Sequence, residues 1–334
     1  MKRIGNLYAR ITEPENLRLA LLKAIRGKRG KQEVLDYTAQ LDENLRQLRE
    51  QLLAHQVDVG HYHFFTVHDP KERVICAAAF PERVLHHAIM NVCEPVLERY
   101  AIHDSYACRM GKGMHAAVLR AQGFTRQFLW YLKLDIRKYF DSIAHDRLLL
   151  LLARRIKDAD VLRLFASIVG TYHTQPGRGL PIGNLVSQHL ANFYLGHLDH
   201  WAKETLRVAG YVRYMDDFVL WAGDRAELAG HLAAVRGFLD TELALVLKEN
   251  VQLNRSERGV PFLGYRVFPW RLALGPRARG RFARKLRAYE RECHDGAWSE
   301  ADLARHMEAL LSYVRFADTV ALRRRIVAKY GTAA

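Results

Sequence analysis

The chain has 334 residues, of which 49% are hydrophobic, and 51 Lys and Arg against 36 Asp and Glu give it a formal net charge of +15. This hydrophobic content excludes a disordered chain, and a cationic surplus of this size favours a polyanionic partner such as a nucleic acid. No run approaches the roughly eighteen apolar residues of a membrane span, and the segment Met1–Asn6 lacks the apolar core of a secretory signal. We therefore expect a cytoplasmic protein that does not associate with a membrane.

The first third of the chain predicts helices followed by a β-hairpin. Residues 15 to about 55 carry two apolar stripes at helical spacing, separated by a basic, glycine-broken loop at 26–31. We interpret that loop as a solvated connector in preference to a direct RNA contact. Two strand-like runs, Tyr62–His68 and Arg73–Ala78, flank a good turn sequence, and a helix is expected over Glu82–Tyr100.

Two strand patterns in the middle of the chain meet acidic residues. The run Trp130–Ile136 is largely apolar until Asp135, and the segment behind it leads into an amphipathic helix near His145. Further along, the β-forming runs Tyr211–Arg213 and Phe218–Trp221 enclose the adjacent pair Asp216 and Asp217. This pattern predicts a tight hairpin with two carboxylates at its turn, although an Asp-Asp pair also suits an ordinary turn.

Asp135, Asp216 and Asp217 could converge from neighbouring strands of one sheet. Adjacent anions repel one another, and divalent cations are the strongest compensation for them. Three carboxylates are the ligand set for two hard cations about 3.5–4 Å apart, which assist phosphoryl transfer. Because oxygen ligands dominate, we expect two Mg²⁺ ions as cofactors, with Mn²⁺ able to replace them. The four cysteines are widely spaced, without a Cys-x-x-Cys pair, and are expected to be reduced thiols.

With these acids, the sequence resembles the reverse transcriptases, which carry an Asp-bearing strand and a Tyr-X-Asp-Asp hairpin, here Tyr214–Asp217. The segment Gly179–Gln188 and the helix after it resemble the family's element beneath the templating base pair. Residues 80–115 are similar to the finger region of the bacterial retroelement branch, and Phe262–Tyr265 is similar to its primer-grip strand. In the family's order, these matches cover roughly residues 57–268.

The resemblance implies an α+β, right-hand polymerase fold. We expect a helical extension at residues 1–56, fingers at 57–127, a palm of antiparallel sheet and helices at 128–268, and a basic helical thumb at 269–334. In the thumb, a cationic stretch from Arg271 to Arg291 precedes a second helical stretch over residues 299–330.

A variant of the Gly179–Gln188 loop narrows the resemblance within the bacterial branch. Group II intron enzymes typically have Gln-Gly in this loop and Ser-Pro at its end, whereas this chain has Ile182-Gly183 and Ser187-Gln188. This version resembles the reverse transcriptases of diversity-generating retroelements, which copy a template RNA with frequent errors at adenines. Retron-like and phage-defence reverse transcriptases remain alternatives within enzymes, and an inactive RNA-binding scaffold is the alternative outside them.

The resemblance also implies roles for individual residues. The metal ions would be held by Asp135, the adjacent Ile136, Asp216 and, less directly, Asp217. Phe140 would form an aromatic wall that excludes a 2′ hydroxyl, with Tyr139 as the alternative. Residues expected near the incoming nucleotide or the templating base are Lys71, Arg73, Arg83, Ile182, Gln188 and Lys248. Residues expected along nucleic-acid phosphates are Arg277, Arg279, Arg281, Arg284, Lys285 and Arg287.

Several partners are expected on the same basis. They are a template RNA and its RNA–DNA hybrid, deoxynucleoside triphosphates, and a small basic accessory protein that assembles into a ring. No residue identifies the surface on which that accessory protein would dock.

Overall fold

The computed structural model describes residues 3–68 and 72–330 and divides into two compact units, each built from three segments of the chain. Unit 1 comprises Met1–His103, Ile136–Thr205 and Ala234–Lys248; unit 2 comprises Asp104–Asp135, Leu206–Ala233 and Glu249–Ala334. Helix α11 (Arg225–Leu243) has residues in both units. These bounds differ from the expected division into extension, fingers, palm and thumb, which stays a prediction.

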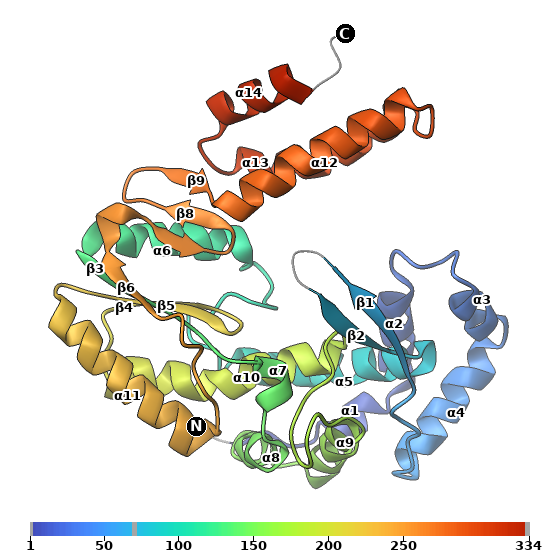
Figure 1. The fold of residues 1–334 in the computed structure, drawn as a ribbon. Coiled ribbons are helices and arrows are strands. Elements are labelled where there is room, and N and C mark those ends of the chain that lie inside the picture. The colour runs from blue at the N-terminus through green and yellow to red at the C-terminus, as the bar shows by residue number, and fades with distance from the viewer. Residues whose placement is uncertain (1–2, 69–71, 331–334) are drawn as a thin grey trace. The chain divides into compact units, whose positions relative to one another are not determined.

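Unit 1 is mainly helical (Figure 1). Its helices pack through the apolar stripes that the sequence shows. Helix α2 lies against α5 through the buried Leu17, Leu21 and Ala24. The predicted stretch 15–55 is three helices, because the chain breaks at the basic loop and again at Gln40. The helices of unit 1 are α1 (Tyr8–Ile11), α2 (Pro14–Ile25), α3 (Gln32–Ala39), α4 (Leu41–Leu53), α5 (Phe80–Glu98), α7 (Tyr139–Ser142), α8 (His145–Ala153), α9 (Ala159–Gly170) and α10 (Leu185–His200), which a short π-helix (Trp201–Thr205) extends.

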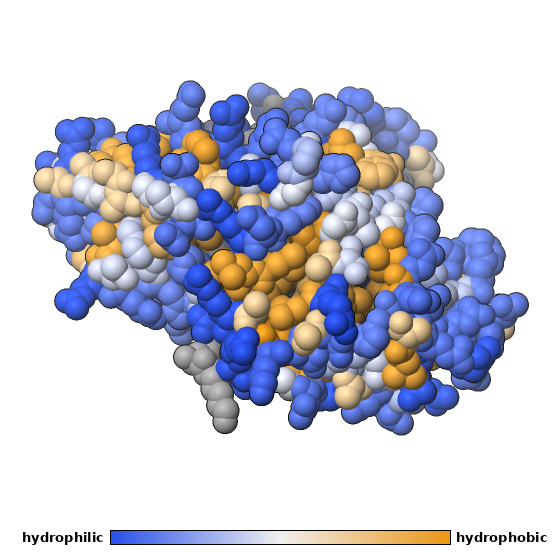
Figure 2. Space-filling model, turned by 90° about the horizontal axis from the view of Figure 1, so that it is seen from below, coloured by the Kyte–Doolittle hydropathy of each residue, from blue (hydrophilic) through white to orange (hydrophobic). Residues whose placement is uncertain are grey.

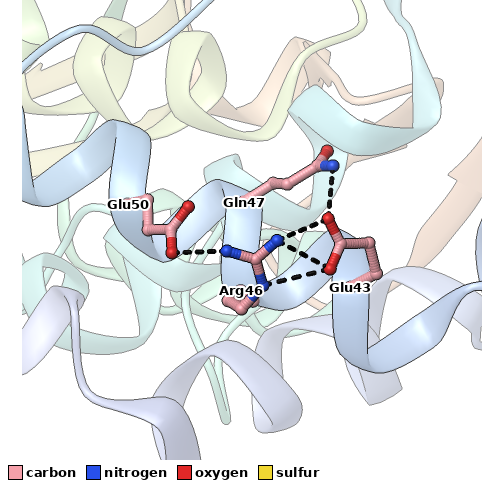
Figure 3. Close-up of polar contacts among 4 residues, drawn as sticks. All are labelled: Glu43, Arg46, Gln47 and Glu50. Carbon is pink, nitrogen blue, oxygen red and sulfur yellow. Dashed lines mark hydrogen bonds and ion pairs between the residues drawn. The ribbon is translucent and has the colours of Figure 1, made fainter.

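The outer face of α4 is polar and carries a small charged network. Arg46 forms ion pairs with Glu43 and Glu50, each with an N–O distance of 2.6 Å, and Gln47 donates a hydrogen bond to Glu43 (Figure 3). These spacings of three and four residues are the ones that bring helix side chains together. Because the pairs are exposed to water, they favour this helix only slightly.

Strands β1 (Tyr62–Val67) and β2 (Arg73–Ala78) form the predicted antiparallel hairpin, with Tyr62 opposite Ala78 and Val67 opposite Arg73. The loop before α10 is attached to this hairpin, since the amide of Cys76 donates to the carbonyl of Ile182 at 2.8 Å. The hairpin and the 182–184 loop therefore form one local structure in unit 1.

Unit 2 contains a four-stranded antiparallel sheet in the order β4–β5–β3–β6 (Figure 1). Its strands are β3 (Trp130–Asp135), β4 (Gly210–Tyr214), β5 (Asp217–Ala222) and β6 (Gln252–Arg255). Residues 218–222 of the inner strand β5 are all buried, and Tyr131 and Trp221 join a hydrophobic core with residues of helix α6 (Met114–Gln127). The predicted strand at 130–136 and hairpin at 211–221 are confirmed.

A second sheet of unit 2 joins this core and leads into the C-terminal helices. Its strands are β7 (Val260–Phe262), β8 (Tyr265–Val267) and β9 (Leu272–Leu274), preceded by a 3₁₀ turn at Ser256–Arg258 and followed by α12 (Pro276–His294), α13 (Glu300–Arg315) and α14 (Val320–Tyr330). The predicted helical stretch over 299–330 consists of two helices, α13 and α14. The break comes at residues 316–319, where the amide and carboxylate of Asp318 bind the main chain of Leu272, each at 2.9 Å.

The sequence predicts a strand over Phe262–Tyr265. In the structure, this segment is instead the turn between β7 and β8. Phe262 lies opposite Tyr265, and Leu263 and Gly264 connect them with φ angles of 50° and 86°. Two-residue hairpin turns require such left-handed backbone angles, which glycine adopts without cost. A Cβ atom on Gly264 would lie 2.3 Å from the hydroxyl oxygen of Tyr313, so the close approach of α13 also requires glycine here.

We expect Gly264→Ala to lower the free energy of unfolding by roughly 2–4 kcal/mol, because the added methyl group meets both an unfavourable φ and the Tyr313 hydroxyl. Urea denaturation measures this loss. Adding Tyr313→Phe should restore part of it. The matched control is Gly280→Ala within α12, where a Cβ would have no neighbour within 4 Å. A loss at position 280 as large as that at 264 would contradict the close-approach explanation.

On the face drawn in Figure 2, hydrophilic residues predominate and hydrophobic residues gather in smaller areas between them. None of the described helices is both long enough and apolar enough to cross a membrane.

Candidate active site

The strand register of unit 2 brings the predicted acids to one end of the sheet. Asp135, the last residue of β3, lies directly opposite Asp217, the first residue of β5. Asp217 also pairs with Tyr214 across the β4–β5 turn, so Asp216 lies within that turn. Directly opposed residues of antiparallel strands have neighbouring side chains. Three carboxylates that are distant in sequence therefore belong to one local region of unit 2.

The β4–β5 turn is held by a buried arginine that the sequence analysis missed. Met215 adopts a left-handed φ of 56°, a costly conformation for this residue type. Arg213 is 1% exposed and donates to the carbonyl of Met215 at 3.0 Å and to the hydroxyl of Ser105 at 3.0 Å. The guanidinium thus holds the turn through the Met215 carbonyl and places a permanent positive charge near Asp216.

Lys133 is a second missed residue. It lies on β3 two positions before Asp135, and its Nζ binds Oδ2 of Asp217 at 3.0 Å. Both side chains are largely buried, with relative exposures of 17% and 22%. Lys133 therefore supplies a cation to the acidic cluster from within the sheet. The alternation of strand side chains would have placed Lys133 on the face of Asp135, which is the signal that could have identified it.

The environment of Asp217 disfavours the negatively charged form of its carboxyl group. Burial raises the pKa of its carboxyl to about 6; the ion pair with Lys133 opposes this shift, and the charges of Asp135 and Asp216 add to it. Its Oδ1 is buried without a hydrogen-bond partner among the described residues. A buried carboxylate oxygen without a partner costs free energy and is available to a further cation.

The donor chemistry of this region suits a hard divalent ion. Asp135, Asp216 and Asp217 offer only oxygen, the type of ligand that Mg²⁺ binds, and the unpartnered Oδ1 of Asp217 is one such atom. Ile136 is fully buried with an apolar side chain, so it could contribute only its main-chain carbonyl. Over residues 3–68 and 72–330, no three His, Cys, Asp or Glu side chains form a preassembled metal cluster. The carboxylates would have to turn toward a bound ion. The ion pair between Lys133 and Asp217 would then either break or persist beside the metal.

The raised pKa of Asp217 predicts a pH-dependent effect of Asp217→Asn in metal-free protein. The folded state holds a proton up to about pH 6, whereas an unfolded Asp releases it near its ordinary value of 3.8. The contribution of Asp217 to wild-type stability should therefore fall as pH rises from about 4 to 6, and Asn, which mimics the protonated group, should avoid this loss. The free energy of unfolding of Asp217→Asn should exceed that of the wild type by an amount that grows over this interval to ~3 kcal/mol and then stays constant.

Urea unfolding in a chelator at pH 4.5 and 7.5 measures this difference. An advantage that is equal at the two pH values would contradict the assignment of the shifted pKa to Asp217.

Residues predicted near the nucleotide have different environments within unit 1. Lys71 lies outside the described residues. Arg73, the first residue of β2, is exposed, and Lys248 is half-buried next to Leu247, which bridges to Ile136. Arg83 is already paired: its guanidinium binds both oxygens of Glu33, at 2.8 and 3.1 Å, and the carbonyl of Ala78. A role for Arg83 at a triphosphate stays a prediction and would require it to leave Glu33 or to bind beside it.

The two aromatic candidates for the sugar wall are distinguished by their burial. Tyr139 is 3% exposed, and its hydroxyl donates to the carbonyl of Ala191, so its ring belongs to the core of unit 1. Phe140 is only half-buried and packs edge-on against Tyr139, with ring centroids 5.7 Å apart. Of the two rings, Phe140 is the one with an accessible surface. Ile182 and Gln188, at either end of the 182–188 segment, are also half-buried.

The predicted cationic residues of α12 fall into two sets. One set is exposed and comprises Arg277, Arg279, Arg284 and Arg287. The other, Arg281 and Lys285, is half-buried and lines a cavity between α12 and α13. The first set is open to solvent, whereas the second faces the cavity.

Comparison with known proteins supplies a family context for this geometry. A family model described as "Reverse transcriptase (RNA-dependent DNA polymerase)" matches residues 68–267, which include all three acids. Protein YkfC of Escherichia coli strain K12 is 26% identical over 331 residues, covering 82% of this chain and 85% of YkfC. The group II intron-encoded protein LtrA of Lactococcus lactis is 26% identical over 136 residues, covering 39% of this chain and 22% of LtrA.

A solved structure gives a likeness of fold. The structure of apo telomerase from Candida tropicalis has a TM-score of 0.51 and 10% sequence identity, and the match covers 88% of this chain and 64% of that chain. The putative COX1/OXI3 intron 2 protein of Saccharomyces cerevisiae is 21% identical over 57% of this chain but only 30% of its own length. This chain thus covers less than two thirds of the length of each protein named here, apart from YkfC.

Proposed function

Because this chain belongs to the reverse transcriptase (RNA-dependent DNA polymerase) family and has the right-hand polymerase fold, we propose that it copies an RNA template into DNA at Asp135, Asp216 and Asp217. The observation that carries this proposal is the strand register that opposes Asp135 to Asp217, with Asp216 in the adjoining turn. All three acids fall within the segment that matches the family.

In the proposed reaction, the 3′ hydroxyl of a primer attacks the α-phosphorus of a deoxynucleoside triphosphate, and pyrophosphate leaves. Asp135 and Asp216 would hold two Mg²⁺ ions, with Asp217 in a less direct role. When bound, such ions lower the pKa of the attacking hydroxyl and neutralise charge on the leaving oxygen. Arg213 holds the turn that carries Asp216, and Lys133 compensates the negative charge of Asp217.

The remaining predicted residues complete this proposal. Phe140 would exclude a 2′ hydroxyl by steric clash, which discriminates better than the loss of an apolar contact. Arg73, Arg83 and Lys248 would neutralise the triphosphate or the leaving pyrophosphate, and the exposed arginines of α12 would bind backbone phosphates of an RNA–DNA hybrid. We propose the names fingers for 57–127, palm for 128–268 and thumb for 269–334.

Primer extension on an RNA template tests the proposed activity. We expect DNA synthesis that requires Mg²⁺ or Mn²⁺, an RNA template and a complementary primer. Tight RNA binding without extension under any of these conditions would favour the inactive scaffold instead.

We further propose that the enzyme serves a diversity-generating retroelement. This narrower proposal is supported by Ile182-Gly183 and Ser187-Gln188 in the loop before α10 and in its first turn. The relatives named above are intron proteins or YkfC, so the proposal depends on that loop. It implies a small basic accessory protein as a partner. Paired genomic repeats that differ at adenines would support it, whereas a neighbouring defence operon without such repeats would contradict it.

Ile182→Gln is expected to lower misincorporation opposite template adenine by roughly threefold to tenfold, because an amide restores polar contacts near the templating base. Sequencing of cDNA copied from a defined RNA measures the error rate at each base. The control is Ile182→Leu, which keeps an aliphatic side chain of the same size. The fidelity proposal fails if the Gln variant makes as many errors at adenine as the wild type.

A further inference from the structure

A cavity of about 420 Å³ lies between α12 and α13 of unit 2. Its volume is in the range of small-ligand sites. Three cationic side chains line it, Arg281, Lys285 and Arg305, together with the rings of Tyr289, His306 and Tyr313. The polymerase chemistry proposed above makes no use of this cavity.

The arrangement of the lining follows from helix geometry. Arg281, Lys285 and Tyr289 are spaced four residues apart on α12, so they form one stripe along the helix. His306 and Tyr313 project toward the same cavity from α13. The stripe is distinct from the exposed set of arginines on α12, so the helix presents cations in two directions.

The walls of the cavity are fixed by aromatic contacts. The ring of His306 stacks on Trp298 with a centroid distance of 4.0 Å, and Tyr289 lies 5.2 Å from Trp298. At the other end, the guanidinium of Arg281 lies 5.6 Å from the Tyr313 ring, and the Tyr313 hydroxyl lies over Gly264. A capping box of Ser299 and Asp302 fixes the start of α13.

The chemistry of the lining matches one nucleotide. Among the described residues, those that line the cavity include no acid. Arg305 is paired with Asp302, and the guanidinium of Arg281 lies over the Tyr313 ring, so a phosphate in the cavity would bind Arg281 and Lys285 beside the contacts that they already make. Tyr289 and His306 offer rings on which a base can stack. A paired base inside a hybrid cannot reach such rings, because its faces are covered by its neighbours.

We propose that this cavity binds one unpaired nucleotide of a nucleic-acid strand, with its phosphate at Arg281 and Lys285 and its base against Tyr289 and His306. The inference rests on the proposed function, because that function supplies the two strands that could bind here, the template RNA and the newly made DNA. Duplex phosphates would instead contact the exposed arginines of α12. An extrahelical nucleotide held here would anchor the strand next to the Gly264 turn, which contacts Tyr313.

Calorimetric titration of the full chain with a single-stranded tetraribonucleotide, and separately with its deoxy equivalent, tests the site. We expect binding of at least one of them, and the stronger ligand identifies the strand. Lys285→Ala and Tyr289→Leu should each weaken binding about tenfold, whereas Tyr289→Phe, which keeps the ring, should bind like the wild type. The matched control is Arg291→Ala, which removes one exposed charge from α12 outside the cavity.

Three results would overturn the inference: no binding of either tetranucleotide by the wild type, unchanged binding by Tyr289→Leu, or an equal loss with Arg291→Ala. Circular dichroism and thermal melting confirm that each variant is folded. Primer extension is measured on the same preparations. A wild type that extends primers without binding a tetranucleotide overturns only this inference, and one that binds without extending overturns only the proposed function.

Discussion

Asp216→Asn is expected to reduce primer extension by roughly 1000-fold, which corresponds to about 4 kcal/mol of transition-state stabilisation. The amide keeps the size of the side chain and the turn held by Arg213, but it removes the charge that would bind metal. Single-turnover extension on an RNA template measures the chemical step, and the variant should be as stable as the wild type or slightly more stable, since one like charge near Asp217 is lost.

Asp240→Asn is the matched control for this substitution. Asp240 is exposed on α11, and the same loss of one charge there should leave extension unchanged. If Asp216→Asn retained more than about a tenth of the wild-type rate, Asp216 would not be a ligand of the reacting metal ions.

Phe140→Val is expected to have the second largest effect, a loss of roughly 100-fold in the preference for deoxynucleotides over ribonucleotides. A smaller side chain would remove the clash with a 2′ hydroxyl while leaving the neighbouring Tyr139 in the core. Steady-state incorporation of dNTP and rNTP on the same primer measures the ratio of the two kcat/KM values. The rate with dNTP should change far less than the ratio.

Tyr139→Phe is the matched control for the sugar wall. It removes only the hydroxyl that donates to Ala191, so it should lower the free energy of unfolding by about 1 kcal/mol and leave sugar preference unchanged. Relaxed discrimination in Tyr139→Phe, together with unchanged discrimination in Phe140→Val, would show that the wall was assigned to the wrong ring.

The acids were predictable from sequence because local patterns encode them. Strand-forming runs end at Asp135 and flank Asp216 and Asp217, and each strand needs only its own residues to be identified. Their opposition depends on pairing between β3 and β5, which the shared family order made a reasonable expectation. The hairpin at 62–78 was predictable for the same local reason.

The contacts between distant segments were not predictable in this way. Strand alternation places Lys133 on the face of Asp135, but its pairing with Asp217 depends on the register between β3 and β5. Nothing near Arg83 in sequence indicates that its partner is Glu33, because this pair forms only after the chain has folded. The helix break at residues 316–319 likewise depends on Asp318 meeting Leu272. The turn at Leu263 and Gly264 carries a local signal, since glycine between two short apolar runs favours a hairpin turn, whereas the resemblance to the family's primer-grip strand favours a strand.

Cleavage of the chain by Fe²⁺ bound in place of Mg²⁺ would locate the metal ions directly. Hydroxyl radicals formed at a bound iron cut the nearest peptide bonds, and mass spectrometry identifies the cut positions. We expect cuts near Asp135 and near Asp216 that excess Mg²⁺ suppresses and that Asp216→Asn weakens. Cuts confined to other parts of the chain, or cuts at only one of the two acids, would contradict a shared metal site at the end of β3 and β5.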